Sequence, residues 1–228
     1  LEEAGWEVED TPTSGDQGVD LITGKLLAMA SLAEDMVERS VHALLEGDDE
    51  VARQVRADDD KLDAMEQEVD ELAMEILTMG PMATDLRAIT IGMKISNDLE
   101  RVGDEASTIC KRIININKHA DWKVPLREEI AAMGEKACLL LRESMDAYVE
   151  HDSEKARQLI PQDEGVDDLN KMYQKQLIQS MMDNPQDIPM LMQVGVIVKR
   201  VERVGDHAIN IAEDVVFIEE AADIRHDN

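Results

Sequence analysis

The sequence predicts an all-α protein built as a tandem repeat of two antiparallel three-helix bundles. Apolar residues recur at the spacing of a helix face through most of the chain, and no alternating, strand-like run bounded by turns interrupts them. Segments that align without gaps at an offset of 104 residues show that the chain repeats itself. The identical residues at this offset include Asp48/Asp152, Glu50/Glu154, Ala52/Ala156, Arg53/Arg157 and Gln54/Gln158.

Each repeat is expected to contain three helices separated by helix-breaking residues. Gly47 ends the first helix, and Pro81 and Pro185 mark the turn before the last helix of each repeat. Thr84 and Asp85 are expected to cap the third helix. The expected helices cover residues 18–46, 49–79, 84–116, 126–151, 152–182 and 188–222, with a bend where Pro161 and Gly165 interrupt the fifth.

The repeat also sets the expected domain organisation. A polar segment ending in Thr11-Pro12-Thr13-Ser14-Gly15 precedes the first helix, and a short stretch around Trp122 and Pro125 joins the two repeats. The expected divisions are an amino-terminal tail at 1–17, a first three-helix repeat at 18–118, a linker at 119–125 and a second three-helix repeat at 126–226.

The composition indicates the kind of core that the chain forms and excludes some classes of function. At 43% hydrophobic content and 2% aromatic residues, the core must be largely aliphatic. A formal charge of −28 excludes ordinary nucleic-acid binding, which needs a basic surface. No run approaches the roughly 18 apolar residues that span a bilayer, and no signal peptide opens the chain. We therefore expect a soluble, cytoplasmic protein without a transmembrane segment, in which Cys110 and Cys138 are buried and reduced.

One five-residue sequence, Glu-Arg-Val-Gly-Asp, occurs twice. It begins at Glu100 and again at Glu202, both times within an apolar-periodic stretch that predicts a helix. Residues four apart share a helix face, so Glu100 lies beside Asp104 and Glu202 beside Asp206. Two carboxylates held in this way repel each other unless a cation lies between them.

A second acidic pair is repeated on the preceding helix. Asp59 and Asp63 are four residues apart, and Asp163 and Asp167 match them at the repeat offset. The turn prolines lie midway between the two acidic pairs of each repeat, so an antiparallel hairpin brings the pairs to the same height. Each hairpin should then gather four carboxylates. The predicted clusters are Asp59, Asp63, Glu100 and Asp104, then Asp163, Asp167, Glu202 and Asp206.

Carboxylate clusters without His or Cys at ligand spacing are hard oxygen sites. They suit Mg²⁺, Mn²⁺, Ca²⁺ or iron, and zinc less well. Di-iron bundle enzymes use a Glu-x-x-His motif, whereas Gly103 and Gly205 stand three residues after the two glutamates. Close helix approach and room for a bound ion are two compatible explanations for these glycines. His207 is expected to be exposed or to lie behind the ligands.

No constellation in the sequence supports catalysis. We find no nucleophile with a base, no phosphate-cradling glycine loop and no paired acid and base in an apolar setting. The expectation is a protein that is not an enzyme.

These motifs resemble the PhoU family of phosphate-transport accessory proteins. The resemblance rests on the duplicated Glu-Arg-Val-Gly-Asp, the Asp pair on the helix before it, Asp85-Leu86-Arg87 after the turn and the closing Asp223-Ile224-Arg225-His226. It covers residues 18–226. Two departures stand out: Gly165 lies inside the second Asp pair, and the first fifteen residues match nothing expected of the family.

The resemblance implies two three-helix bundles that bind metal clusters through the eight carboxylates named above. It also implies negative regulation of phosphate uptake and of the phosphate-starvation response. The implied partners are the ATPase subunit of a phosphate ABC transporter and a phosphate-sensor histidine kinase. The residues themselves leave two alternatives open: a helical scaffold with empty acidic faces, and an iron-binding storage or oxidase-like bundle. They also leave open the native metal and whether the chain forms a homodimer.

Overall fold

The computed structural model describes residues 15–119 and 121–220, and within them it contains helices and no strand, which confirms the all-α prediction. The first repeat supplies α1 (Gly15–Glu46), α2 (Asp49–Thr78) and α3 (Ala83–Asn117). The second supplies α4 (Arg127–Glu150), α5 (Ser153–Leu159), the 3₁₀ turn η1 (Ile160–Gln162), α6 (Asp163–Asp183), the 3₁₀ turn η2 (Pro185–Asp187) and α7 (Ile188–Glu220). Most of the predicted tail and the closing Asp223-Ile224-Arg225-His226 lie outside the described residues.

Matched aspartates begin the second helix of each repeat. Asp48 is the N-cap of α2, and its carboxylate accepts hydrogen bonds from the backbone N–H groups of Glu50 and Val51. Asp152 caps α5 and accepts from the N–H of Lys155 at 2.9 Å. Both caps satisfy amide groups that have no partner inside the helix. The identity of these residues between repeats therefore has a local structural cause.

Two of the predicted local details are wrong. Thr84 and Asp85 lie inside the first turn of α3, and the N-cap is Met82, which has an extended backbone and makes no side-chain capping bond. Gly165 does not interrupt its helix, since α6 runs unbroken from Asp163. The tip of the Lys136 side chain of α4 lies over Gly165, with its Nζ 2.3 Å from where a β-carbon would be.

The predicted interruption at Pro161 is present. The second helix of the second repeat is divided into α5 and α6 by η1, in which Pro161 occupies an early position. Proline lacks an N–H and cannot donate the helical hydrogen bond, so the chain tightens into a 3₁₀ turn there. In the first repeat, α2 runs without such a break.

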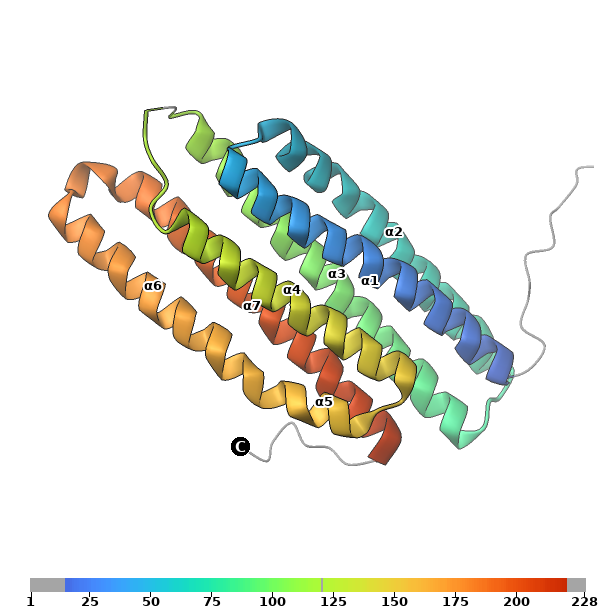
Figure 1. Ribbon diagram of the computed structural model, residues 1–228. Coiled ribbons are helices and arrows are strands. Elements are labelled where there is room, and N and C mark those ends of the chain that lie inside the picture. The colour runs from blue at the N-terminus through green and yellow to red at the C-terminus, as the bar shows by residue number, and fades with distance from the viewer. Residues whose placement is uncertain (1–14, 120, 221–228) are drawn as a thin grey trace, which may run out of the picture.

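The two repeats pack side by side along their full length. Figure 1 shows α3 beside α7 and α1 beside α4, with the α2–α3 and α6–α7 turns at opposite ends of the molecule. One hydrophobic cluster runs through both repeats, from Ile22 on α1 to Val216 on α7, and is almost entirely aliphatic. The repeats therefore share a core. None of the described helices is long and apolar enough to cross a membrane.

Matched polar residues join α3 to α7 in reciprocal pairs. On α3, Asp98 and Glu105 match Arg200 and His207 of α7 at an offset of 102 residues. The His207 Nδ1 lies 2.8 Å from the Asp98 Oδ1, and the Arg200 Nη1 lies 2.8 Å from the Glu105 Oε2. Arg203 adds a contact at 3.0 Å to Glu105, whose side chain is 3% exposed. Asp98 thus contacts the residue that matches Glu105, and Glu105 contacts the residue that matches Asp98. Such reciprocal contacts indicate that the two repeats are related by an approximate two-fold axis.

The two helix glycines beside the acidic pairs have different surroundings. A β-carbon at Gly103 would lie 2.4 Å from the Leu62 Cδ2, so this glycine is required by the close approach of α2 and α3. At the matched Gly205, valine replaces leucine, and a β-carbon would lie 3.5 Å from the Val166 Cγ1, which is an ordinary contact distance. Close packing therefore accounts for Gly103, whereas nothing steric in the second repeat demands glycine.

This difference predicts opposite effects of the same substitution. Gly205→Ala should stabilise the metal-free protein by up to about 1 kcal/mol, because alanine favours the helix. Gly103→Ala should destabilise it by about 1–3 kcal/mol, because the methyl group overpacks a core in which Leu62 is fully buried. Urea unfolding of both variants beside the parent would measure this. Equal effects of the two substitutions would contradict the packing argument.

Candidate metal centres

The two helix hairpins bring the predicted acidic residues together. Asp59 and Asp63 on α2 face Glu100 and Asp104 on α3, and the matched residues of the second repeat face one another across α6 and α7. The Oδ1 atoms of Asp59 and Asp163 lie 3.7 and 3.6 Å from where a β-carbon of Gly103 and Gly205 would be. The same local geometry is thus built twice.

The second cluster is the more tightly gathered. Carboxylate oxygens of Asp167, Glu202 and Asp206 all lie within 4.8 Å of one another. The Oδ1 of Asp163 is buried and has no hydrogen-bond partner. A buried carboxylate oxygen without a donor is costly, and a cation shared with the neighbouring carboxylates would remove that cost. The residues therefore fit a hard, oxygen-coordinated metal ion.

Burial and neighbouring negative charges raise the pKa values of carboxylates in the first cluster. Burial raises the pKa of Glu100 to about 7, and the negative charges of Asp104 and Glu66 add to this effect. Burial also raises the pKa of Asp59, with Asp104 and Asp63 acting in the same direction and a hydrogen bond from Ser107 opposing them. A divalent cation placed here would reverse the sign of the local field.

Burial and neighbouring charges also raise the pKa values of carboxylates in the second cluster. Burial raises the pKa of Asp163, and the charges of Asp167 and Glu202 raise it further. Burial is again the largest cause of the raised pKa of Asp206, followed by the charge of Asp163. Burial also raises the pKa of Glu202, but here the ammonium group of Lys199 opposes the shift.

The clusters differ in exposure and in their neighbours. Asp63 and Asp104 of the first cluster are exposed, whereas all four carboxylates of the second are buried or half-buried. In the second cluster Lys199 contacts both Glu202 oxygens, and the Asn170 Nδ2 donates to the Glu202 Oε1 at 3.1 Å. The sequence analysis missed both of these neighbours. A comparison of the aligned repeats could have drawn attention to them, because the first repeat has Glu66 and Asn97 at the matched positions.

His207 lies between the repeats. Its side chain is 12% exposed and pairs with Asp98 of the other repeat. Of the two expected positions, the exposed one is therefore wrong, and the histidine lies behind the proposed ligands. It lines a hollow of about 420 Å³ together with Asp163 and Asp206. The position thus connects the second cluster to α3, which a single-repeat argument could not show.

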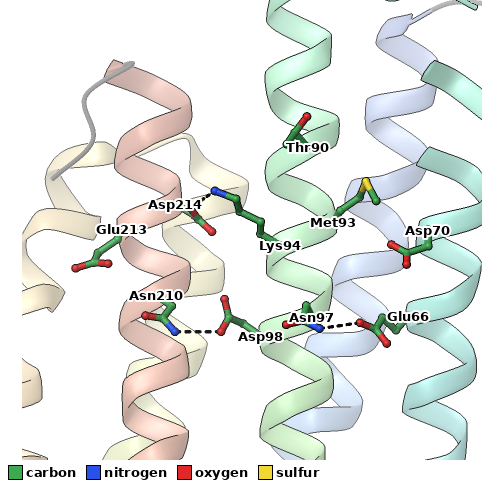
Figure 2. Close-up of a pocket in the computed structure, with 10 residues that line it drawn as sticks. All are labelled: Glu66, Asp70, Thr90, Met93, Lys94, Asn97, Asp98, Asn210, Glu213 and Asp214. Carbon is green, nitrogen blue, oxygen red and sulfur yellow. Dashed lines mark hydrogen bonds and ion pairs between the residues drawn. The ribbon is translucent and has the colours of Figure 1, made fainter. Parts of the chain in front are cut away.

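An acidic groove of about 650 Å³ runs beside α3 and reaches both neighbouring helices. Figure 2 shows Glu66 of α2 turned toward Asn97 of α3, and Asp98 of α3 turned toward Asn210 of α7. The Lys94 Nζ lies 3.7 Å from the Asp214 Oδ1 in the same groove. Glu66 lines this groove, and its charge also acts on Glu100 of the first cluster.

Comparisons with known proteins agree with the all-α fold. A family model described as the PhoU domain matches residues 26–113 and 130–215. The chain is 34% identical over 206 residues to the phosphate-specific transport system accessory protein PhoU homolog of Pseudomonas aeruginosa, covering 90% of this chain and 85% of the relative. It is 35% identical over 206 residues to the homolog of the same description from Rhizobium meliloti, covering 89% and 86%.

Solved structures match as well. The crystal structure of PhoU from Pseudomonas aeruginosa superposes with a TM-score of 0.87 at 33% identity, covering 91% of this chain and 99% of that one. The phosphate transport system regulatory protein PhoU from Streptococcus pneumoniae gives a TM-score of 0.84 at 24% identity, covering 92% and 98%, which supports the fold alone.

The raised pKa of Glu100 predicts how the metal-free protein responds to pH. The folded protein holds the Glu100 proton up to about pH 7, whereas the unfolded chain releases it near pH 4.5. The stability that this group contributes is therefore present below pH 4.5 and is lost as the pH rises to about 7. Glu100→Gln should flatten this loss, as measured by urea unfolding of metal-stripped protein across that range.

A matched variant sharpens the measurement. Glu66→Gln leaves Glu100 ionisable but removes a charge that raises its pKa. This variant should therefore lose its stability at a lower pH than the parent. Identical pH profiles for the parent and both variants would show that the first cluster is not under electrostatic stress.

Proposed function

This chain belongs to the PhoU family, and on that premise we propose that it is a metal-binding, non-enzymatic regulator of phosphate uptake. The curated relatives are accessory proteins of a phosphate-specific transport system. The proposed role is to restrain transport and the phosphate-starvation response when phosphate is plentiful. The proposed partners are the ATPase subunit of a phosphate ABC transporter and a phosphate-sensor histidine kinase.

The observation that carries the metal-binding part is the second cluster. Three carboxylates within 4.8 Å of one another, beside a buried Asp163 oxygen that lacks a partner, suit a hard divalent cation or iron. Asp163, Asp167, Glu202 and Asp206 would hold the ion there. Asp59, Asp63, Glu100 and Asp104 would hold its counterpart in the first repeat.

A bound ion offers a direct route from metal to regulation. Each cluster is shared between two helices of one hairpin, so an ion would hold α2 against α3 and α6 against α7. Binding to the folded form alone stabilises it by about 2.7 kcal/mol at a hundredfold excess over the dissociation constant. We infer that metal fixes the shape of the surface that the partners meet.

Deletion of this protein in its host tests the regulatory part. Phosphate-starvation genes should stay expressed in phosphate-rich medium, and the parent chain supplied in trans should silence them. A chain carrying Glu202→Gln and Asp206→Asn should fail to silence them, because it lacks two of the proposed ligands. Reporter expression in phosphate-rich cultures is the measurement.

The control removes the same charge elsewhere. Glu128→Gln with Glu129→Gln neutralises two exposed carboxylates at the start of α4, and this chain should silence the genes normally. Unchanged reporter expression after deletion would count against a role in phosphate regulation. Full silencing by the chain with Glu202→Gln and Asp206→Asn would show that phosphate regulation does not depend on metal at the second cluster.

A further inference from the structure

The two acidic clusters are built from matched carboxylates but are flanked by residues of different charge. The position of Glu66 in the first repeat is Asn170 in the second, and that of Asn97 is Lys199. One flank therefore changes from a carboxylate to an amide, and the other from an amide to an ammonium group. Both changes make the surroundings of the second cluster more positive.

The flanking residues of the first repeat contact each other. The Asn97 Nδ2 donates to the Glu66 Oε1 at 3.0 Å, and Figure 2 shows the two side chains meeting between α3 and α2. Arg101 lies next to Glu100, with its Nε 3.8 Å from the Glu100 Oε2 and its side chain half exposed. At this distance and exposure, the ion pair contributes little.

The flanking residues of the second repeat instead contact the cluster itself. Lys199 precedes Glu202 by three residues on α7, which places it on the same helix face. Its Nζ contacts both carboxylate oxygens of Glu202, while the Asn170 Nδ2 donates to one of them. The Glu202 side chain is 5% exposed, so the ammonium group lies against a buried carboxylate.

A metal ion would compete for the same atoms. The Glu202 carboxylate is one of the three that gather within 4.8 Å, and its two oxygens are already taken by the ammonium group. Lysine is a compact charge on a flexible stem, and the Lys199 side chain is 51% exposed. It therefore has room to swing into solvent when an ion enters.

We propose that Lys199 is a tethered cation that occupies the second cluster in the metal-free protein and must leave before metal binds through Glu202. The first cluster has an asparagine at the matched position. Its metal affinity is therefore not lowered by a tethered cation. This inference rests on the proposed function, since it presupposes that both clusters bind metal.

Titration of Mn²⁺ into metal-stripped protein tests the proposal, with calorimetry as the readout. Glu100→Gln with Asp104→Asn removes the first site, so that the second is titrated alone. In this background Lys199→Asn should raise the Mn²⁺ affinity about tenfold, the size expected for a lost charge-assisted hydrogen bond. Lys199→Arg keeps the charge and should leave the site weak.

A converse variant does not depend on the stability of the second cluster. Asn97→Lys places the same cation beside Glu100 and should lower the affinity of the first site by about tenfold. The matched control is Lys171→Asn, which removes an exposed cation whose Nζ lies 3.7 Å from the Asp167 Oδ2. It should change the second-site affinity far less than Lys199→Asn does.

Two results would overturn the proposal while leaving the proposed function intact. One is an equal effect of Lys171→Asn and Lys199→Asn, which would mean that net charge alone matters. The other is an unchanged first-site affinity in Asn97→Lys. Absence of Mn²⁺ binding by the parent chain would overturn the metal-binding function together with this inference.

Discussion

Each half of this protein places four carboxylates on one helix hairpin, and at least two of them in each half are buried or half-buried. The hydrophobic packing of the hairpins imposes this arrangement, because Leu62 and Val166 lie against the helix glycines directly beside the acidic pairs. Repulsion and lost hydration are the cost. The two repeats differ in what reduces that cost. Burial raises the pKa of Glu100 to about 7, which favours its neutral form in the first cluster, and the ammonium group of Lys199 contacts Glu202 in the second.

The contact between α3 and α7 joins the helices that carry the two Glu-Arg-Val-Gly-Asp sequences. Its reciprocal ion pairs follow the approximate two-fold axis, and the buried Glu105 is held by two arginines. A carboxylate buried in this way destabilises the fold if its partners are removed. The helices that carry Glu100 and Glu202 therefore pack directly against each other.

Much of this arrangement could be predicted from the sequence, because repetition supplies the missing geometry. The helices follow from apolar spacing, and the hairpins follow from prolines placed midway between acidic pairs. What escaped prediction depends on contacts between distant segments. The sequence predicts a helix break at Gly165, whereas α6 runs through it and the tip of Lys136 from α4 lies over it. His207 and Asp98 belong to different repeats, and no periodicity within one helix indicates that they pair.

The central claim is that the acidic clusters are strained without metal and stabilised by it. Thermal unfolding of a chain with Asp59→Asn, Asp63→Asn, Glu100→Gln and Asp104→Asn, beside the parent, tests this claim most directly. In chelator the variant should melt above the parent, because the repulsion is gone. With saturating Mn²⁺ it should melt below the parent, because it loses the stabilisation by the ion bound at that site. This stabilisation is about 2.7 kcal/mol at a hundredfold excess over the dissociation constant. The same order of melting temperatures under both conditions would contradict the account.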